Sequence, residues 1–529
     1  MSNNPTQEKS WQSLEQHSHE IQKKTLTNLF DTDTARHTDL FFEYDGMRMD
    51  LSKQRITKET LNILVALADE CGMTEKRNAM MRGAILNPTE NRAVLHTALR
   101  RPKQDRVLLN GHNIIDDVHT TLKRMQSLSQ RLDNGTLIGS TGKPIKQIIS
   151  IGVGGSDLGT RMAFNALKHR YQKHDLSFIS NIDPLDLSNT LDKVAPEHAL
   201  FVVISKSFGT QETLRNAMAA RAWLTEKLAD KTKNIDPHFI AVTANEKAAN
   251  DFGISKENIY PLWDWVNGRF SVWSAVGLPL CLALGFENFS KMLNGAYSMD
   301  QHFINTPLQK NLPALLALVG IWNINFLEYN RQAILPYAQA LETFPAYIQQ
   351  LEMESNGKTV DLEGHLITDY QTAPVIFGDV GTNGQHSFFQ QMHQGSATTP
   401  CDFIGIIEPT TPHNHNHHAK LLNNMLAQSQ AMMQGRTKYH PNEPHRYFSG
   451  NKPSTTLLMD ALTPYNLGML MALYEHKSFV QGVIWNINSF DQFGVELGKE
   501  LSRKLENADL NDLDPSTKQL YSYIHNINE

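Results

Sequence analysis

From about residue 145 onward, the chain alternates short apolar runs with longer segments of helical periodicity, and this alternation limits the possible folds most. The first series of apolar runs lies at 146–153, 176–180, 198–205 and 237–244. After helical segments near 280–330, a second series lies at 332–337, 373–379, 402–409 and 454–460. Short apolar strands separated by helices form parallel sheets with helices on both faces. The sequence therefore predicts an α/β protein with two doubly wound modules in tandem, and leaves the strand order open.

The regions outside these two modules are predicted to be helical arms. Residues 58–72 repeat apolar side chains at three- and four-residue spacing and stop at a glycine, which is typical of a helix. A chain of 529 residues is too long for one ordinary core, so we expect several domains. The predicted parts are a helical N-terminal arm (1–120), a first α/β domain (121–285), a second α/β domain (286–505) and a helical C-terminal arm (506–529).

Charge and cysteine content exclude several classes of protein. The formal net charge of −6 comes from 49 basic and 55 acidic residues without a basic block, which argues against nucleic-acid binding. Cys71, Cys281 and Cys401 are too few and too widely spaced for a disulfide framework or a cysteine-based zinc site. The N-terminus is polar, unlike a secretory signal, and the longest apolar stretch, 312–322, is too short to span a membrane. We expect a cytoplasmic protein without a membrane partner.

The stretch IGVGGSDLG at 151–159 follows the first predicted strand. Gly152 and Gly154 fit the first two positions of a dinucleotide fingerprint, but the third glycine position holds Asp157, whose charge would repel a pyrophosphate. A Walker A lysine is also absent from this stretch. Two interpretations stay open. The turn either aims backbone N–H groups and the Ser156 hydroxyl at an anion, or is a plain tight connection.

The stretch SKSFGTQET at 205–213 carries four hydroxyl side chains where a strand passes into a helix. One hydroxyl can cap a helix, but four exceed that need. Ser205, Ser207 and Thr210 are predicted to surround the oxygens of a phosphate monoester, assisted by the helix dipole. Lys206 either adds positive charge or is an ordinary surface lysine.

Four further stretches carry candidate chemical groups. Arg269 follows a glycine within 264–278, either as an oxyanion clamp or as half of a buried structural pair. Glu354 precedes an Asn-Gly turn, either as a solvated side chain or as a general base in a cleft. His386 lies in a glycine-rich turn, and Lys499 follows Gln492 by seven residues, a spacing that predicts one helix face.

The histidine-rich stretch PHNHNHH at 412–418 suggests a metal site, but no cysteine or spaced carboxylate accompanies it. Pro412 favours a polar loop leading into a helix. We therefore predict no metal site here.

Taken together, these stretches resemble the phosphoglucose isomerase family over about 150–500. The stretches that carry the resemblance, in the order of the family, are IGVGGSDLG, SKSFGTQET, NGRFSVWSAVGL, MESNGK, GTNGQHSF and SFDQFGVELGK. The resemblance implies two sugar-isomerase-type (SIS) α/β domains in a homodimer. It also implies interconversion of glucose 6-phosphate and fructose 6-phosphate, with no metal or organic cofactor.

The same resemblance implies a role for each matching residue. Glu354 matches the base that moves a proton between C2 and C1, and Arg269 matches the cation beside the enediolate. His386 and Lys499 match the pair that assists ring opening, with His386 supplied across the dimer interface. The residues that match substrate-binding positions are Gly155, Ser156, Ser205, Lys206, Ser207, Thr210, Gly268, Gln350 and Gln492.

Three positions depart from the family pattern, and three other functions stay open. Ser207 and Gly209 stand where threonines are common, and Asn267 replaces a usual glycine. Ser207 keeps its hydroxyl, whereas Gly209 loses one.

The first alternative function is a non-catalytic sugar-phosphate sensor, which retention of Glu354, His386 and Lys499 argues against. The second is an isomerase for another phosphosugar such as mannose 6-phosphate. A dehydrogenase is a more distant alternative.

Overall fold

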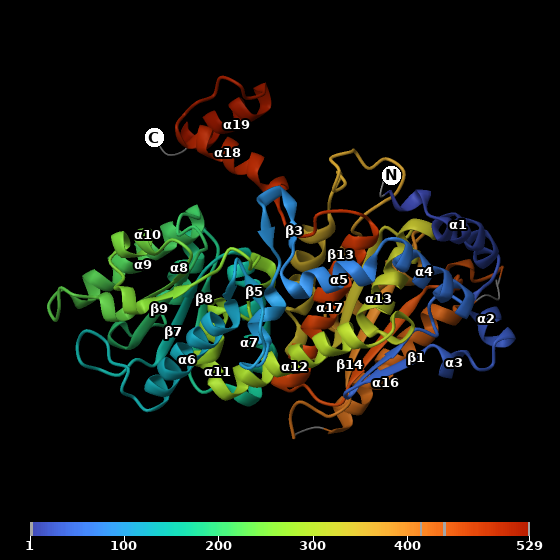
Figure 1. Cartoon of the computed structure of the whole chain (residues 1–529), viewed down its shortest axis with the longest axis horizontal. Helices are drawn as coiled ribbons and strands as arrows, with labels where there is room; N and C mark the ends of the chain where they lie inside the picture. The colour runs from blue at the N-terminus through green and yellow to red at the C-terminus, as the bar shows by residue number, and fades with distance from the viewer. Residues whose placement is uncertain (1–3, 413–414, 437–440, 527–529) are drawn as a thin grey trace. The chain divides into compact units, whose positions relative to one another are not determined.

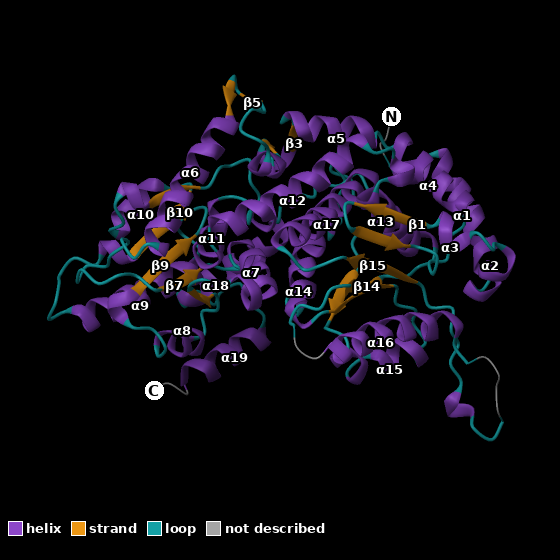
Figure 2. Ribbon diagram, turned by 90° about the horizontal axis from the view of Figure 1, so that it is seen from below, coloured by secondary structure: helices purple, strands orange, loops and turns teal. Residues whose placement is uncertain are grey.

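The computed structural model describes residues 4–412, 415–436 and 441–526 (Figure 1). Its contacts divide the chain into a large unit, residues 1–489, and a small C-terminal unit, residues 490–529. The large unit holds two multistranded sheets with a parallel core, each covered by helices on both faces (Figure 2). The predicted α/β class with two doubly wound sheets is therefore confirmed. The division into four parts expected from the sequence stays a prediction.

The first sheet has five parallel strands in the order β11-β10-β9-β7-β8. All six residues of β9 are buried, because helices cover both faces of the sheet. The four apolar runs predicted between 146 and 244 are strands, and the short β11 is an addition. The strands are β7 (Gln147–Ile151), β8 (Asp175–Ile179), β9 (Ala199–Ile204), β10 (Phe239–Thr243) and β11 (Ile259–Pro261). The helices are α7 (Leu158–Tyr171), α8 (Pro184–Leu191), α9 (Gln211–Leu228), α10 (Glu246–Phe252) and α11 (Leu278–Leu284).

The second sheet has the order β1-β2-β15-β14-β12-β13, and its four later strands are parallel. Helices α15 and α16 cover one face through a core that includes Met392, Met425 and Phe403. The strands are β12 (Arg331–Tyr337), β13 (Val375–Gly378), β14 (Cys401–Ile406) and β15 (Ser454–Met459). The helices are α12 (Phe286–Asn305), α13 (Leu312–Ile321), α14 (Phe344–Ile348), α15 (Phe389–Gln394), α16 (His415–Gln434) and α17 (Pro464–Ile484).

The N-terminal region is helical as expected, but it also contains strands that the sequence analysis did not predict. A hairpin of β1 (Phe41–Tyr44) and β2 (Met47–Asp50) extends the second sheet, because β2 pairs antiparallel with β15. The short strands β3 (Ile85–Asn87), β4 (Arg92–Ala93), β5 (Leu108–Leu109) and β6 (His112–Asn113) form two small ribbons. The helices are α1 (Lys9–Gln22), α2 (Leu26–Thr32), α3 (Arg36–Asp39), α4 (Lys58–Glu70), α5 (Met73–Arg82) and α6 (Ile114–Asp133).

The C-terminal unit consists of α18 (Glu496–Glu506) and α19 (Pro515–Asn526). Gln492 precedes a 3₁₀ turn at Phe493–Val495, and α18 begins only after that turn. The expectation that Gln492 and Lys499 share one helix face is therefore wrong. Gly494 lies inside the interrupting turn, and glycine is a poor helix former. Among the described residues, no helix has the length and apolarity to cross a membrane.

Candidate functional site

The two loops that were predicted to bind an anion lie side by side in the first sheet. One follows β7 and the other follows β9, and these strands are neighbours whose connections leave toward opposite edges of the sheet. Doubly wound sheets bind ligands beyond the carboxyl ends of the strands at this reversal of strand order. A Cβ atom on Gly152 would lie 3.0 Å from the Ser156 Cβ and 3.3 Å from the Ile204 carbonyl oxygen. The strand order, which the sequence left open, therefore brings both loops to one place.

The hydroxyl groups of SKSFGTQET are not used up by helix capping. Thr210 occupies the N-cap of α9, yet its side chain makes no capping hydrogen bond. Its Oγ1 lies 3.2 Å from the Ser205 Oγ, while the Ser207 Oγ accepts a hydrogen bond of 3.2 Å from the Gly209 N–H. The hydroxyls therefore gather at the positive end of an 18-residue helix, where an anion is stabilised. Thr213, the fourth hydroxyl, is buried within α9.

Lys206 connects this loop to the segment that carries Arg269. Its ammonium donates hydrogen bonds of 3.1 Å to the Asp264 carbonyl and 3.2 Å to the Val266 carbonyl. Burial lowers the pKa of Lys206, while the nearby Asp264 carboxylate opposes that shift. Lys206 is thus neither an ordinary surface lysine nor a charge free of protein partners.

A contact that only glycine permits brings the turn after β7 against Gly268 and Arg269. A Cβ atom on Gly155 would lie 2.2 Å from the Gly268 carbonyl carbon and 2.6 Å from the Arg269 nitrogen. Ser271 supports the same turn, because its hydroxyl donates a hydrogen bond of 2.6 Å to the Gly268 carbonyl. Gly155, Ser156, Gly268 and Arg269 are therefore brought together as the sequence analysis expected of one site.

The Arg269 guanidinium joins this turn to the second half of the chain. Its Nε donates to the Ser355 Oγ at 2.6 Å and its Nη2 donates to the Ser489 carbonyl at 2.5 Å. Its Nη1 lies 3.7 Å from the Glu354 Oε1. The Arg269 side chain is only 1% exposed, whereas that of Glu354 is 25% exposed. Arg269 is therefore a fixed, buried cation beside a carboxylate that solvent can reach.

Glu354 ends an unusual helical segment, the π-helix Gln349–Glu354, which follows α14. Gln349 donates to the Ile376 carbonyl at 3.0 Å, which ties the segment to β13. A Cβ atom on Gly154 would lie 3.2 Å from the Gln350 Nε2, so Gln350 approaches the anion loops. Glu352 points into the core toward α17, and Glu354 points toward Arg269. Single π turns occur frequently at functional sites.

Asp157 does not act as the sequence analysis supposed. Its carboxylate is buried and accepts two hydrogen bonds of 2.9 Å from Arg161, one turn along α7. Burial raises the pKa of Asp157, and the Arg161 guanidinium opposes that rise. Because its charge is paired with Arg161, the Asp157 carboxylate is no strong argument against pyrophosphate binding. The missing glycine still argues against a dinucleotide fingerprint.

Three predicted site residues lie on other segments of the chain. His386 ends the 3₁₀ turn Asn383–His386 after β13, where it is exposed. Its ring makes no hydrogen bond or ion pair with another described residue. Lys499 is exposed on α18, and Gln492 is half-buried ahead of that helix, both in the C-terminal unit. Their predicted roles stay predictions.

Sequence reasoning missed two groups that hold Arg269, the Ser355 hydroxyl and the Ser489 carbonyl. Ser355 directly follows Glu354, so its proximity to the site was a usable signal. The role of the Ser489 carbonyl could not be predicted from the sequence, because every residue has a backbone carbonyl. Only the tertiary structure places this one beside Arg269.

The histidine-rich stretch begins a helix earlier than expected, because α16 starts at His415. His413 and Asn414 lie outside the described residues. Among the residues that the structure describes, no group of three or more potential metal ligands gathers.

The fold and this cluster define an α/β protein with two doubly wound sheets, in which the turn after β7 meets the Arg269–Glu354 pair. The sequence pattern of the family described as phosphoglucose isomerase matches residues 50–521, and this chain belongs to that family.

Individual relatives cover nearly the whole chain. This chain is 48% identical over 513 residues to a glucose-6-phosphate isomerase of Deinococcus deserti, and the match covers 94% of each chain. It is 48% identical over 507 residues to a glucose-6-phosphate isomerase of Deinococcus radiodurans, covering 94% of this chain and 93% of that one. The crystal structure of a glucose-6-phosphate isomerase from Chlamydia trachomatis matches with a TM-score of 0.87 and 32% identity. That match covers 99% of this chain and 100% of the other.

Proposed function

We propose that this protein is a glucose-6-phosphate isomerase that interconverts glucose 6-phosphate and fructose 6-phosphate. The observation that carries the proposal is the pairing of Arg269 and Glu354, 3.7 Å apart, beside the hydroxyl loop. A shift of the carbonyl group along a sugar needs one base to move a carbon-bound proton, and a cation to stabilise the negative enediolate. Family membership and the two Deinococcus relatives support the same reaction.

In the proposed mechanism, binding and chemistry occur at opposite ends of the open-chain sugar. The phosphate does not react, and its binding at the hydroxyl loop orients the reacting carbons. Glu354 takes the proton from C2 and returns it to C1, while the fixed Arg269 guanidinium stabilises the enediolate without reorganising. Contacts to the substrate are proposed for Gly155, Ser156, Ser205, Lys206, Ser207, Thr210, Gly268, Gln350 and Gln492.

Ring opening is proposed to require His386 of the partner subunit together with Lys499. The exposure of His386, away from any hydrogen-bonded partner among the described residues, is compatible with a group that acts across a dimer interface. The homodimer and a cytoplasmic location are parts of this proposal, not of the observed fold.

A coupled assay tests the reaction directly, with fructose 6-phosphate supplied and glucose 6-phosphate measured. We expect turnover that is unchanged by EDTA, because no metal is proposed. Mannose 6-phosphate serves as the competing substrate, and exclusive turnover of mannose 6-phosphate would assign the protein to another phosphosugar. Binding of fructose 6-phosphate without turnover would favour the non-catalytic sensor.

Mixed dimers test the role of His386. Glu354→Ala and His386→Ala homodimers are each defective at both sites, whereas a mixed dimer recovers one intact site. With random exchange half of the dimers are mixed, so activity should recover to about a quarter of wild type. Distinguishable tags confirm the exchange. Verified mixed dimers without activity above the parental variants would show that His386 does not act across the interface.

A further inference from the structure

Behind Glu354, the core contains an ion pair that the mechanism above does not use. The Lys477 ammonium on α17 lies 2.6 Å and 2.7 Å from the two carboxylate oxygens of Glu352. Both side chains are 0% exposed. Removing two charges from water costs about as much as their attraction returns, so apolar residues of similar volume often replace such a pair without loss of stability. Stability alone therefore does not explain this pair.

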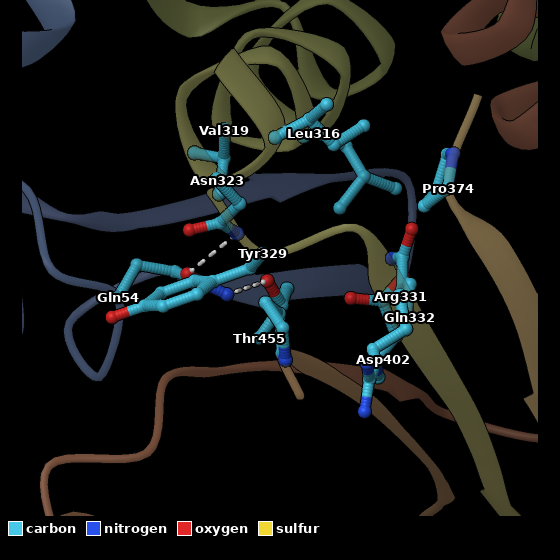
Figure 3. A pocket seen from close by; sticks show the side chains of 13 residues that line it. Gln54, Leu316, Val319, Asn323, Tyr329, Arg331, Gln332, Pro374, Asp402 and Thr455 are labelled. Atoms are coloured by element: carbon cyan, nitrogen blue, oxygen red, sulfur yellow. Dashed lines mark hydrogen bonds between the residues drawn. The ribbon is translucent and has the colours of Figure 1, made fainter. Parts of the chain in front are cut away.

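Lys477 is held in place from the side of the second sheet. Its ammonium also donates to the Gln332 Oε1 at 3.1 Å. Gln332 in turn donates to the Asp402 Oδ2 at 2.7 Å, and the Tyr474 hydroxyl donates to the same oxygen at 3.0 Å. Figure 3 shows Gln332 and Asp402 in the wall of a pocket at the beginnings of β12 and β14. Gln332 and Asp402 therefore anchor Lys477 at the amino ends of β12 and β14, at the opposite end of these strands from their carboxyl ends.

The chain is attached to α17 at a second point, just after the π segment. Asn356, which is fully buried, donates to the Ser478 carbonyl at 3.0 Å. Its Oδ1 accepts a hydrogen bond of 2.7 Å from the Ser489 hydroxyl. Glu354 lies between the two attached residues, Glu352 and Asn356, and faces the other way, toward Arg269. The position of the Glu354 carboxylate is therefore set by attachments on the opposite side of its own helical turn.

We propose that Lys477 and Glu352 are positioning residues for Glu354. This inference rests on the proposed function, because it assigns Glu354 as the base. Lys477 neutralises and fixes the Glu352 carboxylate, and this holds the π segment at the depth where Glu354 meets the substrate carbons. Neither residue touches the substrate, so their loss should change turnover and leave the phosphate grip intact.

The test uses Glu352→Gln, Lys477→Met and the double variant in the full-length protein. A displacement of about 1 Å at a reacting group lowers the reaction rate by about 10²-fold. We expect kcat to fall by about 10–10²-fold in all three variants. KM, and inhibition by a phosphorylated sugar acid, should stay within about twofold. Each single variant leaves an uncompensated buried charge and should unfold at lower urea concentration. The double variant carries neither charge but still buries an amide at position 352, so its loss of stability should be smaller than the sum of the two single losses.

His476→Leu is the matched control, since it removes one buried hydrogen bond from the neighbouring position of α17, made to Asp300 of α12 and not to the network that holds Lys477. It should lower stability and leave kcat within about twofold. Glu352→Asp keeps the charge and shortens the side chain, so it tests the idea if the other variants do not fold. We expect kcat to fall severalfold at unchanged KM.

The outcomes separate the two proposals. An active wild type combined with full kcat in the double variant, or in Glu352→Asp, would overturn the positioning role and leave the isomerase proposal standing. A kcat loss in His476→Leu equal to that in the double variant would also overturn it, because general loosening would then explain both. A wild type without isomerase activity would overturn both proposals.

Discussion

The parallel cores of the two sheets have the same strand order but carry different functional groups. In each sheet the first strand lies between the second and the third, as in β8-β7-β9 and β13-β12-β14. The first sheet presents glycines and hydroxyls on loops at its strand ends. The second contributes Glu354 from a helical segment whose rear is tied to buried charges. In the proposed mechanism, one fold, used twice, provides an adaptable binding site for an unreactive phosphate and a rigid support for a reacting carboxylate.

This difference has a physical reason. A phosphate has several equivalent oxygens, so hydroxyls, backbone N–H groups and a helix dipole can bind it without one exact geometry. A base must reach one carbon-bound proton, and small displacements reduce the rate strongly. The comparison therefore predicts that changes around the segment that carries Glu354 lower kcat, whereas changes in the hydroxyl loop after β9 weaken binding.

The largest effect is expected for Glu354→Gln. The amide keeps the size of the side chain and cannot accept the proton, so kcat should fall by about 10²–10⁴-fold, the range for losing a general base. Binding of a phosphorylated sugar acid should stay within about twofold. Steady-state kinetics and inhibition constants measure both effects.

Glu287→Gln is the matched control, because it makes the same change at an exposed glutamate of α12 paired with Lys291. It should leave kcat unchanged. Turnover near wild type in Glu354→Gln would remove Glu354 from the mechanism and break the comparison between the two halves.

The buried polar groups of the second half should also control its stability in acid. Burial lowers the pKa of His302 to about 4, and the Leu312 N–H donates to its Nε2 at 3.0 Å. The unfolded chain binds this proton near pH 6.5 and the folded chain only near 4, so unfolding takes up a proton between these values. Stability should therefore fall as the pH drops from about 6.5 to 4, by about 3 kcal/mol in full.

Urea unfolding of wild type and His302→Gln at pH 7 and pH 4.5 measures this effect. The glutamine oxygen can accept the Leu312 hydrogen bond and does not titrate in this range. The variant should therefore lose less stability than the wild type on acidification. Equal losses of stability in both proteins would show that protonation of His302 does not destabilise the fold in acid.

Much of the fold could be predicted because its signals are local. Apolar runs such as 198–205 mark strands wherever they pair, and the hydroxyls that follow lie at a strand end in any parallel sheet. The hairpin at β1 and β2 was missed although its signal was present. Asp45 and Gly46 both have positive φ, 48° and 79°, as the favoured two-residue hairpin turn requires. Its pairing with β15, far along the chain, has no local signal.

The candidate site was predictable residue by residue but not as an arrangement. Glycine, hydroxyl, arginine and glutamate positions could be found, whereas the approach of Gly155 to Gly268 depends on tertiary packing. The buried pair of Glu352 and Lys477 joins residues 125 positions apart, and both look like ordinary polar residues of a helix. The expected helix through Gln492 failed because periodicity alone ignores a glycine-containing break.

A smaller effect is expected for Ser205→Ala combined with Thr210→Ala, which tests the first half of the comparison. A hydrogen bond to a charged group is worth about 1.5–3 kcal/mol. The two hydroxyls lie 3.2 Å apart, so their losses should not add fully. We expect affinity for a phosphorylated sugar acid to fall by about 10–150-fold, with much less change for its dephosphorylated analogue.

Ser188→Ala with Thr190→Ala is the control pair, because these hydroxyls bond to backbone carbonyls within α8. It should leave both inhibitors unaffected. If the loop variant weakened both inhibitors equally, the loop would not bind phosphate.

The smallest effect is expected for Ser355→Ala, at the point where the two halves meet. The change removes the acceptor of the Arg269 Nε, which lies 2.6 Å from the Ser355 Oγ, and leaves the bond to the Ser489 carbonyl. A buried donor without its partner costs about 1–3 kcal/mol, and the remaining contacts limit the displacement of the guanidinium. We expect kcat to fall by about tenfold at nearly constant KM.

Ser478→Ala is the matched control, since that buried hydroxyl has no hydrogen-bond partner among the described residues and should be dispensable. If Ser355→Ala instead weakened phosphate binding with kcat intact, Arg269 would belong to the grip, and the division of roles between the two sheets would have to be redrawn.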